Sequence, residues 1–109
     1  MRFSFGNDNN VEKALKQAEK YAQQGKLANA IEEYQKVLDA NPHDKNVLNT
    51  VGDLCVRAGR PDDASQYFVL VAERYESEGA VQSAIAVYKK IVKLEGVSPD
   101  VTIKLADML

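Results

Sequence analysis

Residues 25–34 read GKLANAIEEY, and this stretch decides the fold. Two later stretches repeat its spacing: residues 59–68 read GRPDDASQYF and residues 79–88 read GAVQSAIAVY. In all three, an alanine follows the glycine after five residues and an aromatic residue follows it after nine. The first two glycines lie 34 residues apart. A period of this length is typical of arrays of paired helices, in which each pair buries its apolar face against its neighbours.

The remainder of the chain predicts six helices joined by short turns, with no strand. Apolar and small residues recur at steps of three and four, which is the spacing of one helix face. Gly25 and Gly59 are expected to end helices, because glycine accepts a left-handed conformation. Asn41-Pro42 stops another helix, since proline disfavours helix in the residue before it. The fold class is therefore all-α with antiparallel helices, expected at residues 9–24, 27–40, 45–58, 61–78, 80–95 and 98–109.

The start of the chain is predicted to lie outside the helices. Residues 1–8 show no helical period and are expected to form a flexible N-terminal arm. The first helix is expected to begin at Asn9, because Asn9 and Glu12 have the spacing of a capping box. The helical domain would then span residues 9–109.

Two features predict how the helices pack. A glycine in the middle of a helix costs about 1 kcal/mol relative to alanine, so Gly52 predicts the close approach of a neighbouring helix. Residues 67–72 are six consecutive apolar residues. Such a run covers most of the helix circumference, so the helix at 61–78 is expected to be buried on more than one side.

Composition limits the classes of function. The chain has 109 residues, is 45% hydrophobic and carries a formal net charge of -2, with Lys89-Lys90 as its longest basic run. These values indicate one domain without a nucleic-acid or anionic-membrane surface, which would need clustered Lys and Arg. No stretch of about 18 uncharged apolar residues is present to span a bilayer, and the N-terminus does not resemble a secretory signal. The single cysteine cannot form an internal disulfide, so a cytoplasmic location is expected.

The sequence offers no catalytic constellation. The only histidine, His43, lies in the turn after Pro42 and is expected to be solvated. Cys55 lies on an apolar helix face, where a packed and inert thiol is expected. One histidine and one cysteine do not supply the ligands of a usual zinc site, and no glycine-rich phosphate loop follows a strand. We therefore expect no enzymatic activity, no cofactor and no metal.

With the helix pairs placed, the chain resembles a tetratricopeptide repeat (TPR) protein of bacterial type. The resemblance implies 34-residue helix–turn–helix units that form a right-handed superhelix. Repeat 1 maps to residues 11–44 and repeat 2 to residues 45–78. The matching positions are Ala18, Tyr21, Gly25, Ala30, Tyr34 and Pro42 in repeat 1, and Leu48, Val51, Gly52, Cys55, Gly59, Ala64, Phe68 and Val71 in repeat 2.

The third copy departs from the TPR period. Gly79 follows Gly59 by only 20 residues, so the third unit, residues 65–98, overlaps repeat 2. Either the helix at 61–78 serves both units, which we favour, or the phase breaks and the array bends. Residues 99–109 would form an incomplete fourth unit. Because solenoid ends normally need a polar cap, its apolar residues suggest the N-terminal part of a longer protein, or an end covered by self-association.

The resemblance implies a protein–protein interaction scaffold. In TPR proteins, the first helices of successive units line a concave groove that holds a peptide or helix of a partner. The positions of this chain that match the groove are Glu12, Leu15, Glu19, Asn46, Asn49, Asp53 and Arg57. Leu15 and Glu19 stand where one TPR subclass carries a Lys and an Asn that clamp carboxylate tails, so no such clamp is expected.

Two other roles remain open from the sequence. The chain could oligomerise through its terminal helices as a structural or self-assembly module, with another copy bound at the C-terminal half-repeat. It could instead be a regulatory segment of a larger protein. The partner is expected to be a protein or peptide, and neither nucleic acid nor membrane.

Overall fold

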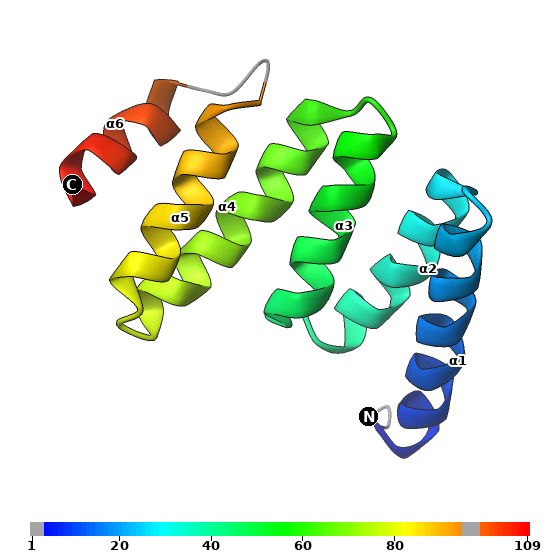
Figure 1. Cartoon of the computed structure of the whole chain (residues 1–109). Coiled ribbons are helices and arrows are strands. Elements are labelled where there is room, and N and C mark those ends of the chain that lie inside the picture. The colour runs from blue at the N-terminus through cyan, green and yellow to red at the C-terminus, as the bar shows by residue number, and fades with distance from the viewer. Residues whose placement is uncertain (1–3, 95–98) are drawn as a thin grey trace.

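A computed structural model describes the backbone of residues 4–94 and 99–109, and the side chains of residues 10–94 and 103–109. This part of the chain contains α-helices and no strand, which confirms the all-α prediction. Successive helices run antiparallel and form one array from α1 to α6 (Figure 1). The helices are α1 (Ser4–Gln23), α2 (Leu27–Ala40), α3 (Lys45–Arg57), α4 (Pro61–Ser77), α5 (Val81–Val92) and α6 (Pro99–Met108).

The same turn occurs three times, after α1, α3 and α4. Its glycine has a positive φ in each case, 75° at Gly25, 74° at Gly59 and 76° at Gly79. The amide of the next residue donates a hydrogen bond to the carbonyl five residues earlier, at N···O distances of 2.8–2.9 Å. This is the Schellman arrangement, in which left-handed glycine closes a helix and satisfies its last carbonyls. The turns therefore define three hairpins of one kind: α1–α2, α3–α4 and α4–α5.

Helix α4 belongs to two of these hairpins. It packs extensively along both α3 and α5, whereas the contacts of α2 with α3 and of α5 with α6 are sparser. Helices α3 and α5 flank α4 on either side (Figure 1), and an ion pair between Lys90 and Asp53 links them. Helix α4 therefore packs against a helix on each side, and its assignment to two overlapping repeats stays a prediction.

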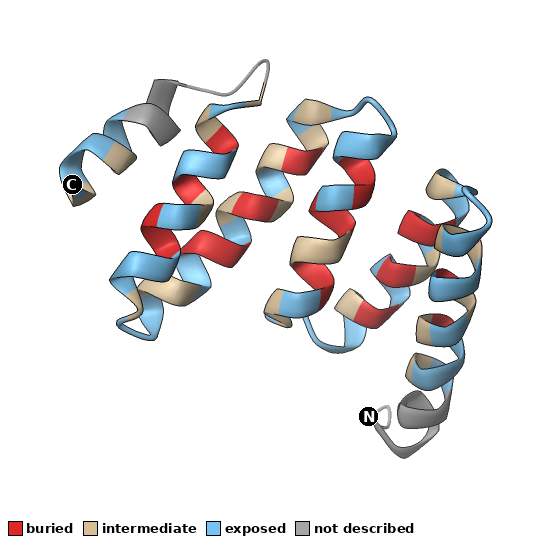
Figure 2. Cartoon of the chain, viewed as in Figure 1, coloured by how far each residue is buried: buried red, intermediate tan, exposed pale blue. Residues whose placement is uncertain are grey.

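The core lies between the helices, as the buried residues in Figure 2 show. Phe68 of α4 is fully buried and its ring lies directly against Gly52 of α3. A Cβ atom at Gly52 would lie 2.7 Å from Cζ of that ring, closer than real Cβ contacts. The close approach predicted from Gly52 is therefore present, and the neighbour is the aromatic residue of the same repeat.

Burial of α4 is less complete than its apolar run predicted. Phe68, Val71 and Ala72 are buried, but Leu70 is 47% exposed. Because α3 and α5 cover two sides of α4, a third side that carries Leu70 remains open to solvent. Burial on more than one side is confirmed, and burial of the whole run is not.

The prediction for the start of the chain was wrong for residues 4–8. Helix α1 begins at Ser4, so these residues are helical and Asn9 lies within the helix rather than at its cap. Once a helix is nucleated, each further residue adds a backbone hydrogen bond, so weak helix formers can extend it. Residues 1–3 lie outside the described residues.

The array is extended rather than closed. Its radius of gyration is 14.9 Å and its principal extents are 43 × 31 × 19 Å. A compact domain of this length would have a radius of gyration of about 13 Å. The helices contact mainly their neighbours along the chain, as in a helical-repeat array.

Candidate functional site

The predicted groove residues of α1 share one flank of that helix but differ in burial. Glu12 and Glu19 are exposed, and Leu15 is half-buried against the core. Glu19 lies close enough to Tyr34 of α2 for its charge to change the pKa of the Tyr34 hydroxyl. Burial first, and then the Glu19 carboxylate, raise the pKa of the Tyr34 hydroxyl. On this flank, Glu12 and Glu19 therefore offer carboxylates, and Leu15 contributes mainly to packing.

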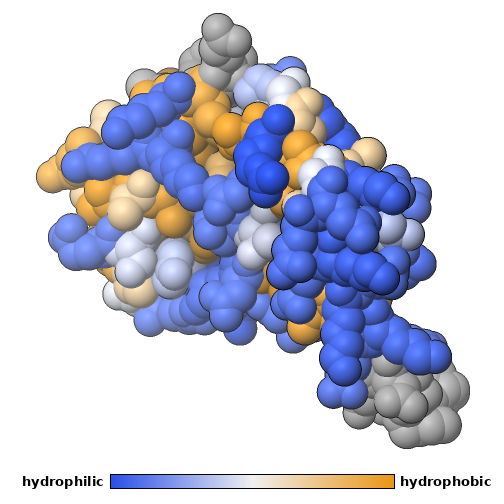
Figure 3. Space-filling view, turned by 45° about the vertical axis from the view of Figure 1, so that its right-hand side comes forward, coloured by the Kyte–Doolittle hydropathy of each residue, from blue (hydrophilic) through white to orange (hydrophobic). Residues whose placement is uncertain are grey.

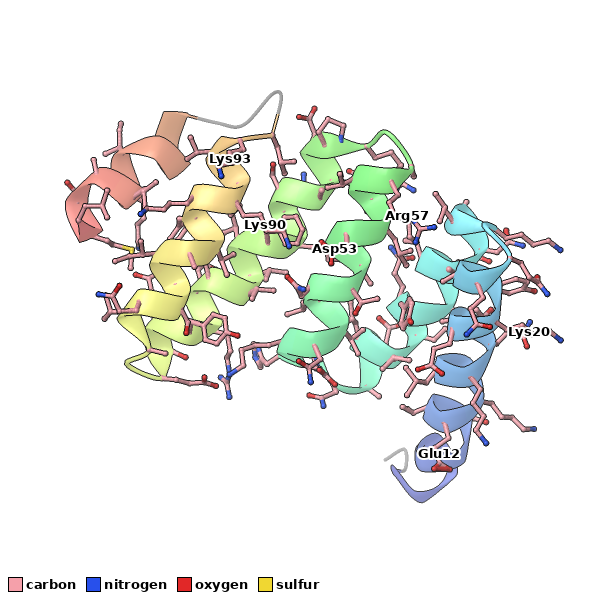
Figure 4. The ribbon with its side chains drawn as sticks, viewed as in Figure 1. Glu12, Lys20, Asp53, Arg57, Lys90 and Lys93 are labelled. Carbon is pink, nitrogen blue, oxygen red and sulfur yellow. The ribbon has the colours of Figure 1, made fainter. Side chains whose placement is uncertain are left out.

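The predicted residues of α3 form a polar stripe. Asn46, Asp53 and Arg57 are exposed, and Asn49 is half-buried. The helix is positioned by Asp44, whose carboxylate accepts a hydrogen bond from the Val47 amide at 3.2 Å as an N-cap. Asp53 points towards α5, whereas Arg57 points towards the side of α2 (Figure 4).

The structure does not join the α1 and α3 residues into one bonded cluster. No side-chain hydrogen bond or ion pair connects the two sets among residues 10–94, and α1 and α3 do not pack extensively on each other. The two sets are thus separate stripes on neighbouring hairpins. A ligand that touched both would have to span them.

Sequence reasoning missed one residue beside the α3 stripe, Lys90 of α5. Lys90 of α5 lies 3.0 Å from Asp53 Oδ1, and its ammonium group lies 4.3 Å from the centroid of the Phe68 ring. Both charged side chains are about half exposed, so the pair is screened and weakly stabilising. The shortened interval between Gly59 and Gly79 was the available signal, because a shared α4 returns α5 to the side of α3.

Further charged contacts lie where the start of α3 meets the end of α4. Lys45 forms an ion pair with Glu78 and stacks on the Tyr75 ring at 4.7 Å. The hydrogen bond from Lys45 holds the pKa of Glu78 below its ordinary value. Tyr88 donates a hydrogen bond to Glu76 at 2.8 Å, and burial, followed by that carboxylate, raises the pKa of Tyr88. These contacts hold α3, α4 and α5 together and are not positioned to bind a ligand.

The residues considered for catalysis lie apart. Cys55 is a fully buried free thiol, and burial raises its pKa, which lowers the fraction of reactive thiolate. His43 is exposed in the α2–α3 turn. In the described part of the chain, no group of three or more His, Cys, Asp or Glu side chains could hold a metal ion. No helix in that part has both the length and the apolar character to cross a membrane.

The repeated hairpins and the αL glycines define an all-α helical-repeat protein. A family model described as tetratricopeptide repeat matches residues 21–77, more than half of the chain. The chain belongs to the tetratricopeptide repeat family. This family is generally a non-catalytic protein-interaction fold. No curated protein matches the chain in sequence.

Three solved structures share the fold over nearly all of this chain. The crystal structure of the MamA protein has 21% identity and a TM-score of 0.52, covering 93% of this chain and 63% of that chain. The first TPR domain of Spaghetti (RPAP3), bound to the HSP90 peptide SRMEEVD, has 18% identity and a TM-score of 0.51, with coverages of 92% and 90%. The Yersinia enterocolitica type III secretion chaperone SycD, in complex with a peptide of the translocator YopD, has 15% identity and a TM-score of 0.54, with coverages of 93% and 90%. At these identities, the likeness shows the fold alone.

Proposed function

We propose that this chain binds a segment of a partner protein along the flank formed by α1 and α3. The observation that carries the proposal is the polar stripe of α3, which stays exposed in an extended array. Asparagine amides on such a stripe can satisfy the donors and acceptors of a peptide backbone together. The proposed contact residues are Glu12, Leu15, Glu19, Asn46, Asn49, Asp53 and Arg57.

The class of partner is supported by the fold. The RPAP3 domain and SycD each hold a peptide on a scaffold of the same kind. Arg57 is the strongest single candidate contact, because arginine is enriched among residues that dominate binding energy. Asp53 would have to leave Lys90 in order to bind a partner's cation. This exchange costs little, because the pair is exposed.

The test compares two double variants. Asn49→Ala with Arg57→Ala removes the centre and one end of the α3 stripe. Gln66→Ala with Glu73→Ala changes two exposed residues of α4 and serves as the matched control. A partner captured by the wild-type chain is titrated by calorimetry against both variants. We expect about tenfold weaker binding for the α3 variant only; equal affinity for both variants would remove this flank from the binding site.

Self-association is a second candidate, favoured by exposed apolar residues in α6 and directly after it. Ile103 is 60% exposed and Leu109 is 75% exposed. A second copy could cover them and so form a homo-oligomer. Sedimentation velocity at several concentrations tests this, with Ile103→Ser and Leu109→Ser as the disrupting pair. A monomer at every concentration would exclude the assembly role.

We also infer a cytoplasmic location. The chain has a single cysteine, Cys55, which is buried as a free thiol, so the fold does not depend on an internal disulfide. Cell fractionation with an antibody to the intact chain tests this inference. Recovery of the chain in a secreted fraction would contradict it.

A further inference from the structure

An open hollow of about 720 Å³ lies on the hairpin of α1 and α2. Its rim carries four lysines, three from α1 and one from α2, and Gln17 also lines it. Lys20 projects outward from α1, on the side away from α3 (Figure 4). Figure 3 shows the α1 side of the molecule covered mainly by hydrophilic atoms. We refer to this cavity as the lysine hollow, after its four lysines, Lys13, Lys16, Lys20 and Lys36.

Positive charge exceeds negative charge in the lining of the lysine hollow. Among the described residues that line it, the only carboxylate is Glu33, which binds Lys36 at 3.0 Å. No ion pair joins Lys13, Lys16 or Lys20 to a carboxylate among residues 10–94. The hollow therefore gathers four cations around one anion, on a chain whose formal net charge is -2.

Lys13 and Lys16 are three residues apart and Lys16 and Lys20 four apart, so like charges face each other along α1. Such pairs destabilise a helix by about 0.2–0.5 kcal/mol each. Glu12 and Glu19, four residues before and three residues after Lys16, offset part of this repulsion. An anionic ligand would relieve the repulsion that remains.

The lysine hollow adjoins the proposed peptide-binding flank. At about 100° per residue, the three lysines of α1 fall within a sector of about 60°. Glu12 and Glu19 lie beside this sector, about 40° and about 60° from Lys16. On its outer side the hollow extends to α2, where Lys36 joins the lysines of α1.

The geometry points to an acidic segment of a partner protein, and we propose that the lysine hollow binds one. The three lysines of α1 span about 10 Å along the helix axis. Alternate side chains of an extended peptide recur about every 6.6 Å, so two or three Asp or Glu residues at alternate positions would meet these ammonium groups. The flexible lysine stems adapt to the remaining difference in spacing.

Nucleic acid fits the lysine hollow less well. Binding to a duplex depends on neutralising many phosphates along a long basic surface, and this hollow offers four cations. Single strands are usually held by aromatic side chains on which bases stack, and no aromatic residue among residues 10–94 lines the hollow. The hollow therefore suits a short run of carboxylates.

The test uses a fluorescein-labelled decapeptide of alternating Glu and Ser, followed by anisotropy in about 50 mM salt, where surface charges are weakly screened. The test variant is Lys13→Gln, Lys16→Gln and Lys20→Gln together. The matched control, Lys26→Gln, Lys89→Gln and Lys93→Gln, changes the net charge equally at exposed positions elsewhere. We expect about tenfold weaker binding for the test variant and wild-type binding for the control. Circular dichroism verifies that both variants remain helical.

Three results would overturn the proposal. They are no binding of the probe by the wild-type chain up to about 1 mM, equal loss in both triple variants, and tighter binding of a DNA oligonucleotide of the same charge through the same lysines. The Asn49→Ala, Arg57→Ala variant is expected to bind the probe normally. That result separates failure of the lysine hollow from failure of the α1–α3 flank.

Discussion

The α1–α2 hairpin and the α3–α4–α5 unit contain the same turn but are held together by different contacts. Ion pairs and hydrogen bonds link α3, α4 and α5 through Lys45–Glu78, Lys90–Asp53 and Tyr88–Glu76. Among the described residues, no side-chain hydrogen bond or ion pair joins α1 to α2. The two helices of the first hairpin are thus held to each other by apolar packing, and its one ion pair among the described residues, Lys36–Glu33, lies within α2. The second unit uses several charged side chains between its helices.

The largest expected effect is the loss of the Phe68 ring. Phe68→Ala should destabilise the chain by about 4 kcal/mol, because the ring is fully buried against α3 and beneath Lys90 of α5. Chemical denaturation measures the change. Tyr34 holds the equivalent position in the first hairpin, so hydrogen exchange should show that Phe68→Ala loosens α3, α4 and α5 more than α1. Uniform loosening of all helices would show that the two regions do not differ in this way.

Adding one methyl group at Gly52 should have the next largest effect. Gly52→Ala is expected to destabilise by about 2 kcal/mol, because the Phe68 ring must move, despite the better helix propensity of alanine. The first hairpin already carries alanine at the equivalent Ala18, which is fully buried. Phe68→Leu in the Gly52→Ala background should recover part of the loss. A neutral or stabilising Gly52→Ala, measured by denaturation, would show that the close packing is not needed.

A substitution at Asp44, in the turn between the first hairpin and α3, should destabilise the chain less than the changes at Phe68 and Gly52. Asp44→Ala removes the N-cap of α3 and should cost about 1 kcal/mol. Asp44→Asn keeps an acceptor oxygen and should cost less. Thermal unfolding of both variants distinguishes the cap from a general charge effect. Equal losses would assign the role to the charge of Asp44 and not to the cap.

The smallest expected effect is a pH dependence confined to the α3–α4–α5 unit. Lys45 lowers the pKa of Glu78 from its ordinary value of 4.5, so the folded chain favours the carboxylate. The resulting stabilisation is present above pH 4.5 and is lost as the pH falls through the lower folded value. Denaturation at several acidic pH values should show a smaller loss for Glu78→Gln than for the wild type. If the free energy of unfolding changed with pH in the same way for both proteins, the Lys45–Glu78 pair would contribute nothing to the acid sensitivity.

The candidate site was only partly readable from the sequence. The stripe Asn46, Asn49, Asp53 and Arg57 followed from helical spacing within α3, and the structure leaves most of it exposed. Lys90 could not be assigned to Asp53, because 37 residues separate them and only the shared α4 brings them together. The lysine hollow was hidden for a related reason, since Lys36 lies on a different helix from the other three lysines.

The sequence by itself determined the helices, their glycine turns and the close contact at Gly52, because these depend on local conformation and on a period of a few residues. It also predicted that α4 has the same glycine turn at each end, through the 20-residue interval between Gly59 and Gly79. Only the tertiary structure decided which charges pair and which stay free, and that Leu70 remains exposed. Those outcomes depend on where distant helices lie relative to one another. That placement follows from the summed packing of the array and from no single segment.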